Sequence, residues 1–314
     1  MAKKSQKNVK QQSLIILNNL NERKITKMKQ QKYIIENQES FELKDIFECG
    51  QCFRWNKNED GTYTGVINKG VLNVEKQGKN VIFTGVLDGD IEEIVRFYFD
   101  LDRNYEEIKA QLSNIDKYLK TSVEYGKGIR ILNQDLWETI ISFIISANNN
   151  IPRIKGIIER ISEKYGAEIE WNGKNYYTFP TPEQLSQATV EDLRALGTGF
   201  RDVRIYETTQ KVLMGEIDLN EIAKKDTLTA REELLTLSGV GPKVADCILL
   251  FSTLKRFDVF PIDVWVRRVM NELYIKNEDE NKVSKKEIMK IAEQKFGAIQ
   301  GLAQQYLFYW KREA

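Results

Sequence analysis

The chain has 314 residues, 41% of them hydrophobic, which is long enough for two domains with ordinary cores. No apolar run is long enough to span a membrane and no signal peptide opens the chain, so we expect an intracellular protein without a membrane partner. The sequence has no histidine and only three cysteines, which excludes histidine-based catalysis, histidine-ligated zinc and a four-cysteine iron–sulfur cluster.

The net charge of +1 is unevenly distributed along the chain. Residues 1–32 carry nine Lys or Arg against Glu22 alone, a balance of +8 that leaves −7 for the remainder. This Lys/Gln/Asn-rich composition predicts a flexible basic tail. Its apolar patch, LIIL at 14–17, leaves two roles open, either non-specific attraction to nucleic acid by the charges or packing of LIIL onto the fold.

Residues 33–115 are predicted to form a small β-rich domain with an antiparallel sheet. Between residues 40 and 87 apolar residues alternate with period two, and TYTGVI, GVLNVEK and NVIFTGV are typical of strands. Asp60-Gly61 predicts a hairpin turn. The CGQC motif of Cys49 and Cys52 runs into this strand pattern instead of opening a helix, which disfavours a thioredoxin-type redox site.

Helical patterns begin near Asp90, and residues 116–314 are predicted to form a larger helical domain. LWETIISFIIS at 136–146 is apolar over a wide face and predicts a core helix that the asparagines 148–150 end. Thr181 and Gln184 form a capping box with proline at the first helical position. The predicted fold class is therefore α+β, with an N-terminal antiparallel sheet and a larger helical domain.

Residues 230–252 predict a helix, a hairpin and a second helix. Leucines end the first helix, Gly239 and Gly241 permit a tight turn, and Pro242 occupies the first position of the second helix. Such a hairpin directs backbone N–H groups and the positive end of a helix outward, which suits a phosphate contact without sequence reading.

Lys243 lies in the first turn of this second helix. The helix dipole and apolar neighbours both disfavour its ammonium form, and a neutral amine can attack a sugar C1′ and form a Schiff base. Asp263 follows Pro261 and precedes VWVRRVM, which predicts an N-cap whose carboxylate lies near that lysine. Taken singly, each residue is better explained in a simpler way, Lys243 as a solvated lysine and Asp263 as a plain helix cap.

Together these residues resemble the helix-hairpin-helix base-excision DNA glycosylases. FECGQCFRW at 47–55, SFIISANNNIPR at 142–153, LRALGTGFR at 193–201 and LAQQYLF at 302–308 resemble segments of the eukaryotic-type 8-oxoguanine DNA glycosylases, and the resemblance covers residues 33–310. It implies a bifunctional glycosylase and abasic-site lyase of base excision repair that removes 8-oxoguanine opposite cytosine. Lys243 would attack C1′, Asp263 would support it, and β-elimination would follow.

The resemblance also assigns a pocket for the lesion base. Unlike guanine, 8-oxoguanine carries a hydrogen on N7. The carbonyl of Gly50 would accept a hydrogen bond from this N–H group. Phe308 would stack on the base, Cys247 would form the opposite wall, and Gln304 would bond the Watson–Crick edge. Without the resemblance, Gly50 is an ordinary turn glycine, and core packing explains Gln304 and Phe308, four residues apart on one helical face.

Further positions match family residues that contact the opposite base and the DNA backbone. Asn148, Arg153 and Arg201 would bond the estranged cytosine, and Phe200 would fill the gap where relatives often carry tyrosine. Trp265 stands where many relatives place a histidine facing the DNA backbone, which leaves that contact in doubt. The backbone around Gly239 and Gly241 would contact phosphate, and the resemblance implies a structural monovalent cation on the carbonyls of Leu235, Leu237 and Val240.

Three alternatives remain on sequence alone. The first is a glycosylase of the same superfamily that removes another damaged base, but it would leave the FECGQCFRW segment unexplained. The second is a non-catalytic DNA-binding module, but it would leave the pair Lys243 and Asp263 unexplained. The third is an oxidoreductase that uses the CGQC cysteines. We expect a monomer that acts on damaged double-stranded DNA without a required cofactor. It would work in the cytoplasm or nucleoid if the source is bacterial.

Overall fold

A computed structural model describes residues 28–314. The predicted basic tail therefore lies mostly outside the described residues, and both of its roles stay predictions. The first strand begins at Gln30, so residues 30–32 belong to the sheet and not to the tail. No helix within the described range is both long and apolar enough to cross a membrane.

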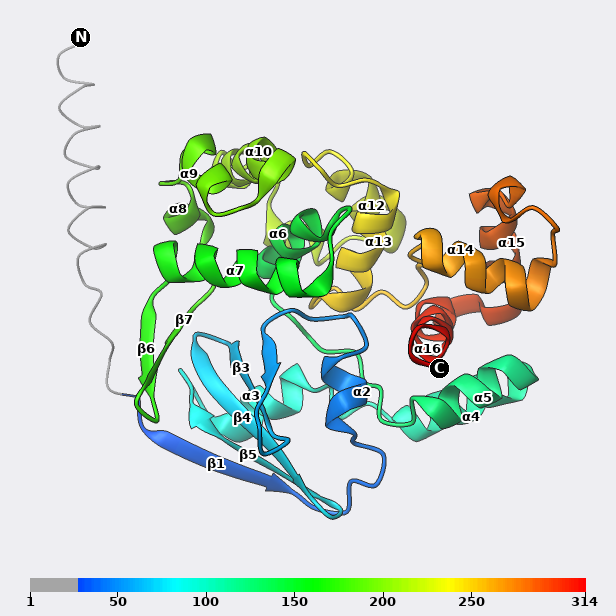
Figure 1. The fold of residues 1–314 in the computed structure, drawn as a ribbon, viewed down its shortest axis with the longest axis horizontal. Helices are drawn as coiled ribbons and strands as arrows, with labels where there is room; N and C mark the ends of the chain where they lie inside the picture. The colour runs from blue at the N-terminus through cyan, green and yellow to red at the C-terminus, as the bar shows by residue number, and fades with distance from the viewer. Residues whose placement is uncertain (1–27) are drawn as a thin grey trace, which may run out of the picture.

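The N-terminal domain contains a five-stranded antiparallel sheet in the order β1-β5-β4-β3-β2 (Figure 1). The three strands expected from period-two alternation are β3, β4 and β5, and the turn before β3 forms as predicted, with Gly61 at φ +86° and Asp60 accepting from the Thr62 amide at 3.0 Å. The predicted antiparallel sheet is confirmed. Its strands are β1 (Gln30–Ile35), β2 (Trp55–Lys57), β3 (Tyr63–Ile67), β4 (Gly70–Gln77) and β5 (Asn80–Val86).

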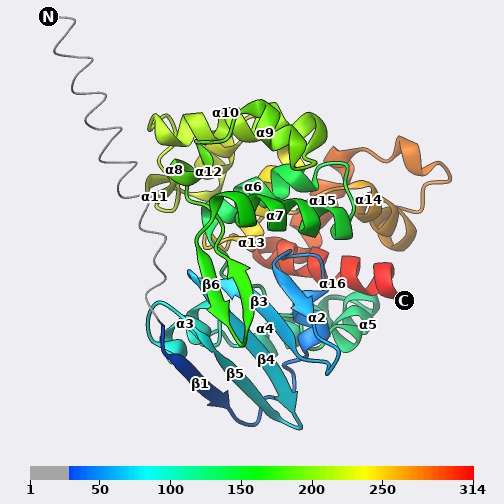
Figure 2. The ribbon, with the colours of Figure 1, turned by 60° about the vertical axis from the view of Figure 1, so that its left-hand side comes forward.

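Helices make up most of the remaining chain; α6 to α15 lie above the sheet, whereas α2, α3, α4 and α5 lie at its level (Figure 2). The α-helices are α2 (Leu43–Phe47), α3 (Ile91–Tyr98), α4 (Tyr105–Ile115), α5 (Lys117–Tyr125), α6 (Leu136–Ser146), α7 (Ile151–Tyr165), α8 (Pro182–Leu185), α9 (Val190–Ala195), α10 (Asp202–Leu213), α11 (Leu219–Ile222), α12 (Thr227–Leu234), α13 (Pro242–Phe251), α14 (Val264–Met270), α15 (Lys285–Phe296) and α16 (Gln300–Glu313). The α+β prediction is confirmed.

Helix α6 is the central helix of the larger domain, as its apolar sequence predicts. Nine of its residues are buried, and it ends at Ser146, immediately before the asparagine run. Asn148 adopts φ +51°, a left-handed conformation that asparagine tolerates better than most residues. Asn150 then caps α7 by accepting from the Arg153 amide at 3.0 Å. The asparagine run therefore turns the chain between two packed helices.

A short hairpin interrupts the helical region, and the sequence analysis missed it. Strands β6 (Glu168–Trp171) and β7 (Lys174–Tyr177) pair across Asn172 and Gly173, which have φ of +50° and +71°. Asn-Gly is a strong signal for a two-residue hairpin, so the sequence contained the information. The hairpin buries Ile169 and Trp171 against valines of the main sheet, which ties the helical domain to the sheet.

The domains meet along α16. Leu112 of α4 and Leu119 of α5 belong to the helical core, although α4 lies within the predicted β-rich segment 33–115. Helix α16 packs against α5 on one side and against α14 and α15 on another (Figure 1). Helix α16 also contacts Glu48 and Cys49 of the N-terminal domain, so the last helix joins the two domains.

Candidate active site

The predicted helix-hairpin-helix is present. Helix α12 ends at Leu234, and α13 begins at Pro242 after Gly241 as its N-cap. Gly239 has φ +84°, and a Cβ there would lie 2.8 Å from Cδ of Arg204 on α10. A larger residue would therefore combine backbone strain with a steric clash, which explains glycine at this position.

Helix α10 supports the hairpin through its polar side chains. Thr208 donates to the Ser238 carbonyl at 3.1 Å, and Lys211 donates to the Thr236 carbonyl at 2.8 Å. In contrast, the carbonyls of Leu235 and Val240 accept no hydrogen bond from any described residue, while that of Leu237 accepts only the Val240 amide at 3.1 Å. The hairpin therefore offers oxygen atoms that match the needs of a hard cation.

Lys243 lies half-buried in the first turn of α13, as predicted. Its Nζ is 5.4 Å from the ring centroid of Phe143 on α6, and that ring packs in turn against Phe53 at 5.5 Å and Phe251 at 5.7 Å. Phe53 belongs to the FECGQCFRW segment. The aromatic cluster therefore connects the lysine of the hairpin to the segment that contains Gly50.

Asp263 caps α14, as predicted, with Oδ1 accepting from the Val266 amide at 2.8 Å. Its second carboxylate oxygen accepts no hydrogen bond from the described residues. The residue is half-buried, and its cap bond fixes the side-chain rotamer. One oxygen thus holds the helix while the other remains available to a bound molecule.

Cys247 lies on α13, one turn after Lys243. Burial raises the pKa of the Cys247 thiol to about 11, the Lys243 ammonium opposes this shift, and the Asp263 carboxylate adds to it. The thiol is 3% exposed. The predicted pocket wall is therefore a buried thiol, protonated at neutral pH, one turn from Lys243.

The CGQC cysteines do not form a redox site. Cys49 and Cys52 are both free and buried, and burial raises the pKa of Cys49 to about 11 and shifts the pKa of Cys52 upward as well. A thiol needs its thiolate form to attack a disulfide. Two buried and protonated thiols agree with the prediction against an oxidoreductase.

Gly50 lies in an irregular turn against α16. It has φ +90°, and a Cβ there would lie 2.9 Å from Nη1 of Arg312 and 3.6 Å from Cε1 of Phe308. Gly50, whose carbonyl is predicted to recognise the lesion base, therefore lies beside Phe308, whose ring is predicted to stack on that base. The positive φ explains glycine at this position, because any side chain would be strained there.

The carbonyls around Gly50 differ in their hydrogen bonding. Those of Glu48, Cys49 and Gln51 accept from Arg312, from Gln305 at 2.7 Å and from Gln134 at 2.8 Å, respectively. The Gly50 carbonyl accepts no hydrogen bond from any described residue. It is thus the one carbonyl of the turn that a ligand can use without displacing a protein donor.

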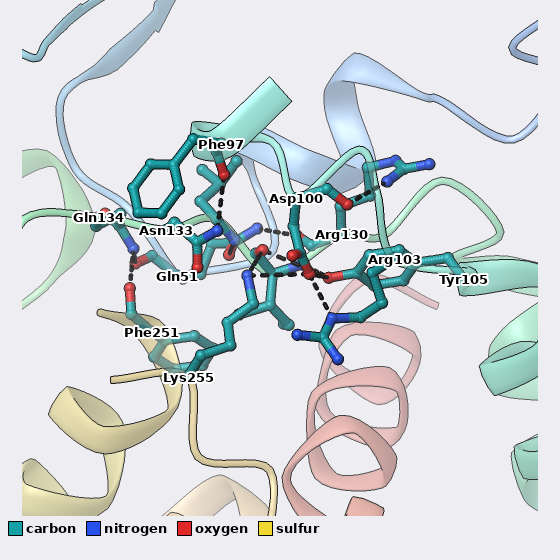
Figure 3. Close-up of polar contacts among 12 residues, drawn as sticks. Gln51, Phe97, Asp100, Arg103, Tyr105, Arg130, Asn133, Gln134, Phe251 and Lys255 are labelled. Carbon is teal, nitrogen blue, oxygen red and sulfur yellow. Dashed lines mark hydrogen bonds and ion pairs between the residues drawn. The ribbon is translucent and has the colours of Figure 1, made fainter. Parts of the chain in front are cut away.

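Gln134 connects this turn to α13. Its Nε2 donates at 2.8 Å to both the Gln51 and the Phe251 carbonyls, and Figure 3 shows it between these two residues. Nearby, Lys255 pairs with Asp100 at 3.3 Å. Burial lowers the pKa of Lys255 to about 8, and Asp100 opposes the shift. These polar contacts of Gln134 and Lys255 attach the segment between α13 and α14 to the N-terminal domain. The same segment leads to Asp263.

Gln304 and Phe308 both lie on α16 and line a small hollow with Val266 and Met270 of α14. Gln304 is 5% exposed, and its buried Oε1 has no hydrogen-bond partner. A buried polar atom without a partner typically costs about 1 to 3 kcal/mol. The Gln304 amide oxygen is thus a buried acceptor without a partner among the described residues.

The predicted opposite-base residues occupy one surface, with one exception. Asn148 and Arg153 are exposed, and Phe200 is 54% exposed. Arg201, in contrast, is 2% exposed and donates to the carbonyls of Ala147 and Asn148, each at 2.9 Å. Arg201 therefore holds the loop that presents Asn148, a structural role that the sequence analysis did not assign.

Trp265 is 51% exposed beside the N-terminus of α14, and the Arg268 guanidinium lies 5.6 Å from its ring centroid. An exposed indole at this place is consistent with a contact outside the protein. Cavity size does not identify the site, because cavities of about 510 Å³ and 820 Å³ contain none of the predicted site residues.

Comparison with known families agrees with this geometry. The family model described as 8-oxoguanine DNA glycosylase, N-terminal domain, matches residues 33–140, and that of the HhH-GPD superfamily base excision DNA repair protein matches residues 141–296. A probable N-glycosylase/DNA lyase of Methanothermobacter thermautotrophicus is 34% identical over 71% of this chain and 76% of its own length. The chain belongs to the 8-oxoguanine DNA glycosylase family.

Two further relatives agree. The N-glycosylase/DNA lyase of Saccharomyces cerevisiae is 32% identical over 74% of this chain and 68% of its own length. The solved 8-oxoguanine glycosylase/lyase of Clostridium acetobutylicum, in complex with double-stranded DNA containing cytosine opposite 8-oxoguanine, superimposes with a TM-score of 0.85 at 45% identity. The match covers 91% of this chain and 97% of that one.

Three residues of this glycosylase site were not found by sequence reasoning, namely Gln134, Gln305 and Arg312. Gln305 is a second buried amide directly after Gln304, and a buried glutamine without a local partner signals a long-range hydrogen bond. Arg312 lies in the last turn of α16, where a basic residue is ordinary. Its contact with the Gly50 turn had no signal in the sequence.

Proposed function

We propose that this chain excises 8-oxoguanine from duplex DNA, preferring cytosine opposite the lesion, and then cleaves the strand at the abasic site. The observation that carries the proposal is the carbonyl of Gly50, a residue that lies beside Phe308. This carbonyl has no partner among the described residues, whereas the carbonyls of Glu48, Cys49 and Gln51 are all bonded. An unpaired acceptor at this place suits the N7 proton that guanine lacks.

Lys243 is the proposed nucleophile. Its neutral amine attacks the sugar C1′, the bond from C1′ to N9 breaks, and the base leaves with the bonding electrons. The attached nitrogen then loses one proton and forms a double bond to C1′, while the bond from C1′ to the ring oxygen O4′ breaks and that oxygen takes up a proton, which leaves an open-chain protonated imine. Loss of a C2′ proton expels the 3′ phosphate by β-elimination. The free carboxylate oxygen of Asp263 would stabilise the positive charge that develops on the sugar.

The proposed pocket places the base between Phe308 and the Cys247 thiol. The neutral thiol packs as a small apolar group, and the ring supplies a stacking surface. The unpaired Oε1 of Gln304 would accept a proton from the Watson–Crick edge. Because base flipping must precede these contacts, the exposed ring of Phe200 would fill the space that the base leaves.

The DNA backbone would meet the hairpin at Gly239 and Gly241 and the N-terminus of α14 at Trp265. A structural monovalent cation would fit the carbonyls of Leu235, Leu237 and Val240, two of which have no hydrogen-bond partner within residues 28–314. It would supply positive charge toward a phosphate and take no part in bond breaking. We also propose that the enzyme works as a monomer, in the cytoplasm or nucleoid if the source is bacterial.

Opposite-base preference is expected to depend on Arg153 more directly than on Arg201. Arg153 is exposed, and the one hydrogen bond that its guanidinium makes to the described residues is long, at 3.5 Å to the Gly197 carbonyl. Arg153→Ala should reduce discrimination between cytosine and adenine opposite the lesion by about 1 to 3 kcal/mol. The measurement is single-turnover base release from both duplexes. Lys164→Ala, at the other end of α7, is the matched control.

Arg201→Ala should act differently, because its guanidinium bonds the backbone that carries Asn148. We expect a smaller difference in rate between cytosine and adenine opposite the lesion, together with a lower melting temperature.

For Arg153→Ala, an equal loss of rate on both duplexes, with an unchanged preference for cytosine, would show that Arg153 binds phosphate only.

The proposed substrate is tested by base release from duplexes that contain 8-oxoguanine, 3-methyladenine or undamaged guanine. We expect release of 8-oxoguanine only. Faster release of 3-methyladenine than of 8-oxoguanine would overturn the proposal and would indicate a glycosylase for alkylated bases.

A further inference from the structure

We propose that Gln305 and Arg312 are positioning residues that set the direction of the Gly50 carbonyl and so determine lesion selectivity. This inference rests on the proposed function, because it concerns the same reader carbonyl. The sequence analysis assigned neither residue a role. Both lie on α16, the helix that also carries Gln304 and Phe308.

The turn needs such support because no regular structure fixes it. Residues 48–51 lie between α2 and β2, outside any helix or strand. Gly50 has φ +90°, and glycine moves between backbone conformations more readily than any other residue. Without external restraints the peptide group after Gly50 could rotate, and its carbonyl would then miss the N7 proton.

Helix α16 provides restraints on the two residues that precede Gly50. Gln305 Nε2 donates to the Cys49 carbonyl at 2.7 Å, and both partners are buried, with Gln305 2% exposed. Arg312 Nη2 donates to the Glu48 carbonyl. These bonds direct the Glu48 and Cys49 carbonyls toward α16, which leaves the Gly50 carbonyl unpaired.

Arg312 also couples the turn to the stacking ring. Its guanidinium lies 5.0 Å from the centroid of Phe308, and its Nη1 would lie 2.9 Å from a Cβ on Gly50. The same side chain therefore contacts both the reader and the ring on which the base would stack. A shift of α16 would move the two together, so their relative geometry is preserved.

The side chain of Gln51 completes the support from the other side. Its Nε2 donates to the Ile46 and Arg130 carbonyls at 2.8 Å and 2.7 Å, and its Oε1 accepts from the Leu132 amide at 2.9 Å. With Gln51 fixed to the N-terminal domain, the two donors of α16 determine the remaining freedom of the turn. Positioning of this kind affects only the step that reads the base.

The test compares two rates in Gln305→Met, which keeps side-chain length but lacks the donor, and Arg312→Met, which keeps an unbranched side chain but is shorter and lacks the donor. The rates are single-turnover release of 8-oxoguanine and cleavage of a preformed abasic site, which has no base to read. We expect base release to fall about ten- to a hundredfold, the scale of a small misplacement, while abasic-site cleavage changes less than about twofold. Arg312→Lys, which retains a donor, should recover most of the base release.

Lys311→Met is the matched control, because Lys311 lies next to Arg312 but pairs with Glu272 at 2.6 Å on the surface. Wild-type enzyme that cleaves abasic sites but does not release 8-oxoguanine would refute the proposed substrate. Given wild-type release, unchanged rates in both methionine variants would overturn the inference. An equal fall in both rates with a lower melting temperature would also overturn it, because it would indicate a structural role. If Gln305→Met does not fold, Arg312→Met decides.

Discussion

Lys243→Gln should abolish base release and strand cleavage while retaining duplex binding. The substitution removes the amine that attacks C1′ but keeps a polar side chain of similar length at the start of α13. We expect the single-turnover rate to fall by roughly 10⁴-fold or more, the scale observed when a covalent nucleophile is lost. Binding to a duplex with 8-oxoguanine, measured by fluorescence anisotropy, should weaken by less than about tenfold, since one phosphate contact at most is lost.

The matched control is Lys286→Gln, which removes the same charge from an exposed position on α15. Its rate and affinity should equal those of the wild type. Residual base release by Lys243→Gln at near the wild-type rate would mean that another group performs the attack. Loss of binding together with activity would mean that Lys243 acts mainly as a DNA contact.

Asp263→Asn should separate the two roles of this residue. Asparagine is as good an N-cap as aspartate, so the bond to the Val266 amide should persist and stability should change little. The negative charge near the reacting sugar is lost, and we expect base release to fall by about 10²- to 10³-fold, as for other groups that stabilise transition-state charge. Thermal melts and single-turnover rates measure the two effects.

Asp263→Ala is the companion variant, because it removes the charge and the cap together. Its rate of base release should fall by the same factor as in Asp263→Asn, and its free energy of unfolding should fall by about 1 kcal/mol. Wild-type activity in Asp263→Asn would show that Asp263 only caps α14. A large loss of stability in that variant would show that the carboxylate supports the fold through its charge.

Local sequence signals predicted much of the fold and site. Gly239, Gly241 and Pro242 determine the hairpin because their backbone preferences act within a few residues. Asp263 and Thr181 are caps for the same reason, since a cap bonds an amide two or three positions ahead. Such features need no knowledge of the tertiary fold.

Long-range contacts were not predictable in this way. Gln305 and Cys49 are separated by 256 positions, and only the packing of α16 on the N-terminal domain brings them together. Arg201 resembled an exposed base contact, yet the fold buries it under the carbonyls of Ala147 and Asn148. The β6–β7 hairpin belongs to a different class, because Asn172-Gly173 was a local signal that the surrounding helical patterns obscured.

Borohydride trapping tests the central claim most directly. The full chain is incubated with a duplex that contains 8-oxoguanine opposite cytosine, reduced, digested and analysed by mass spectrometry. We predict a covalent adduct that maps to Lys243 and is absent with an undamaged duplex, because only an imine at C1′ is reduced to a stable bond. An adduct on a different lysine, or release of 8-oxoguanine without any adduct, would contradict the account.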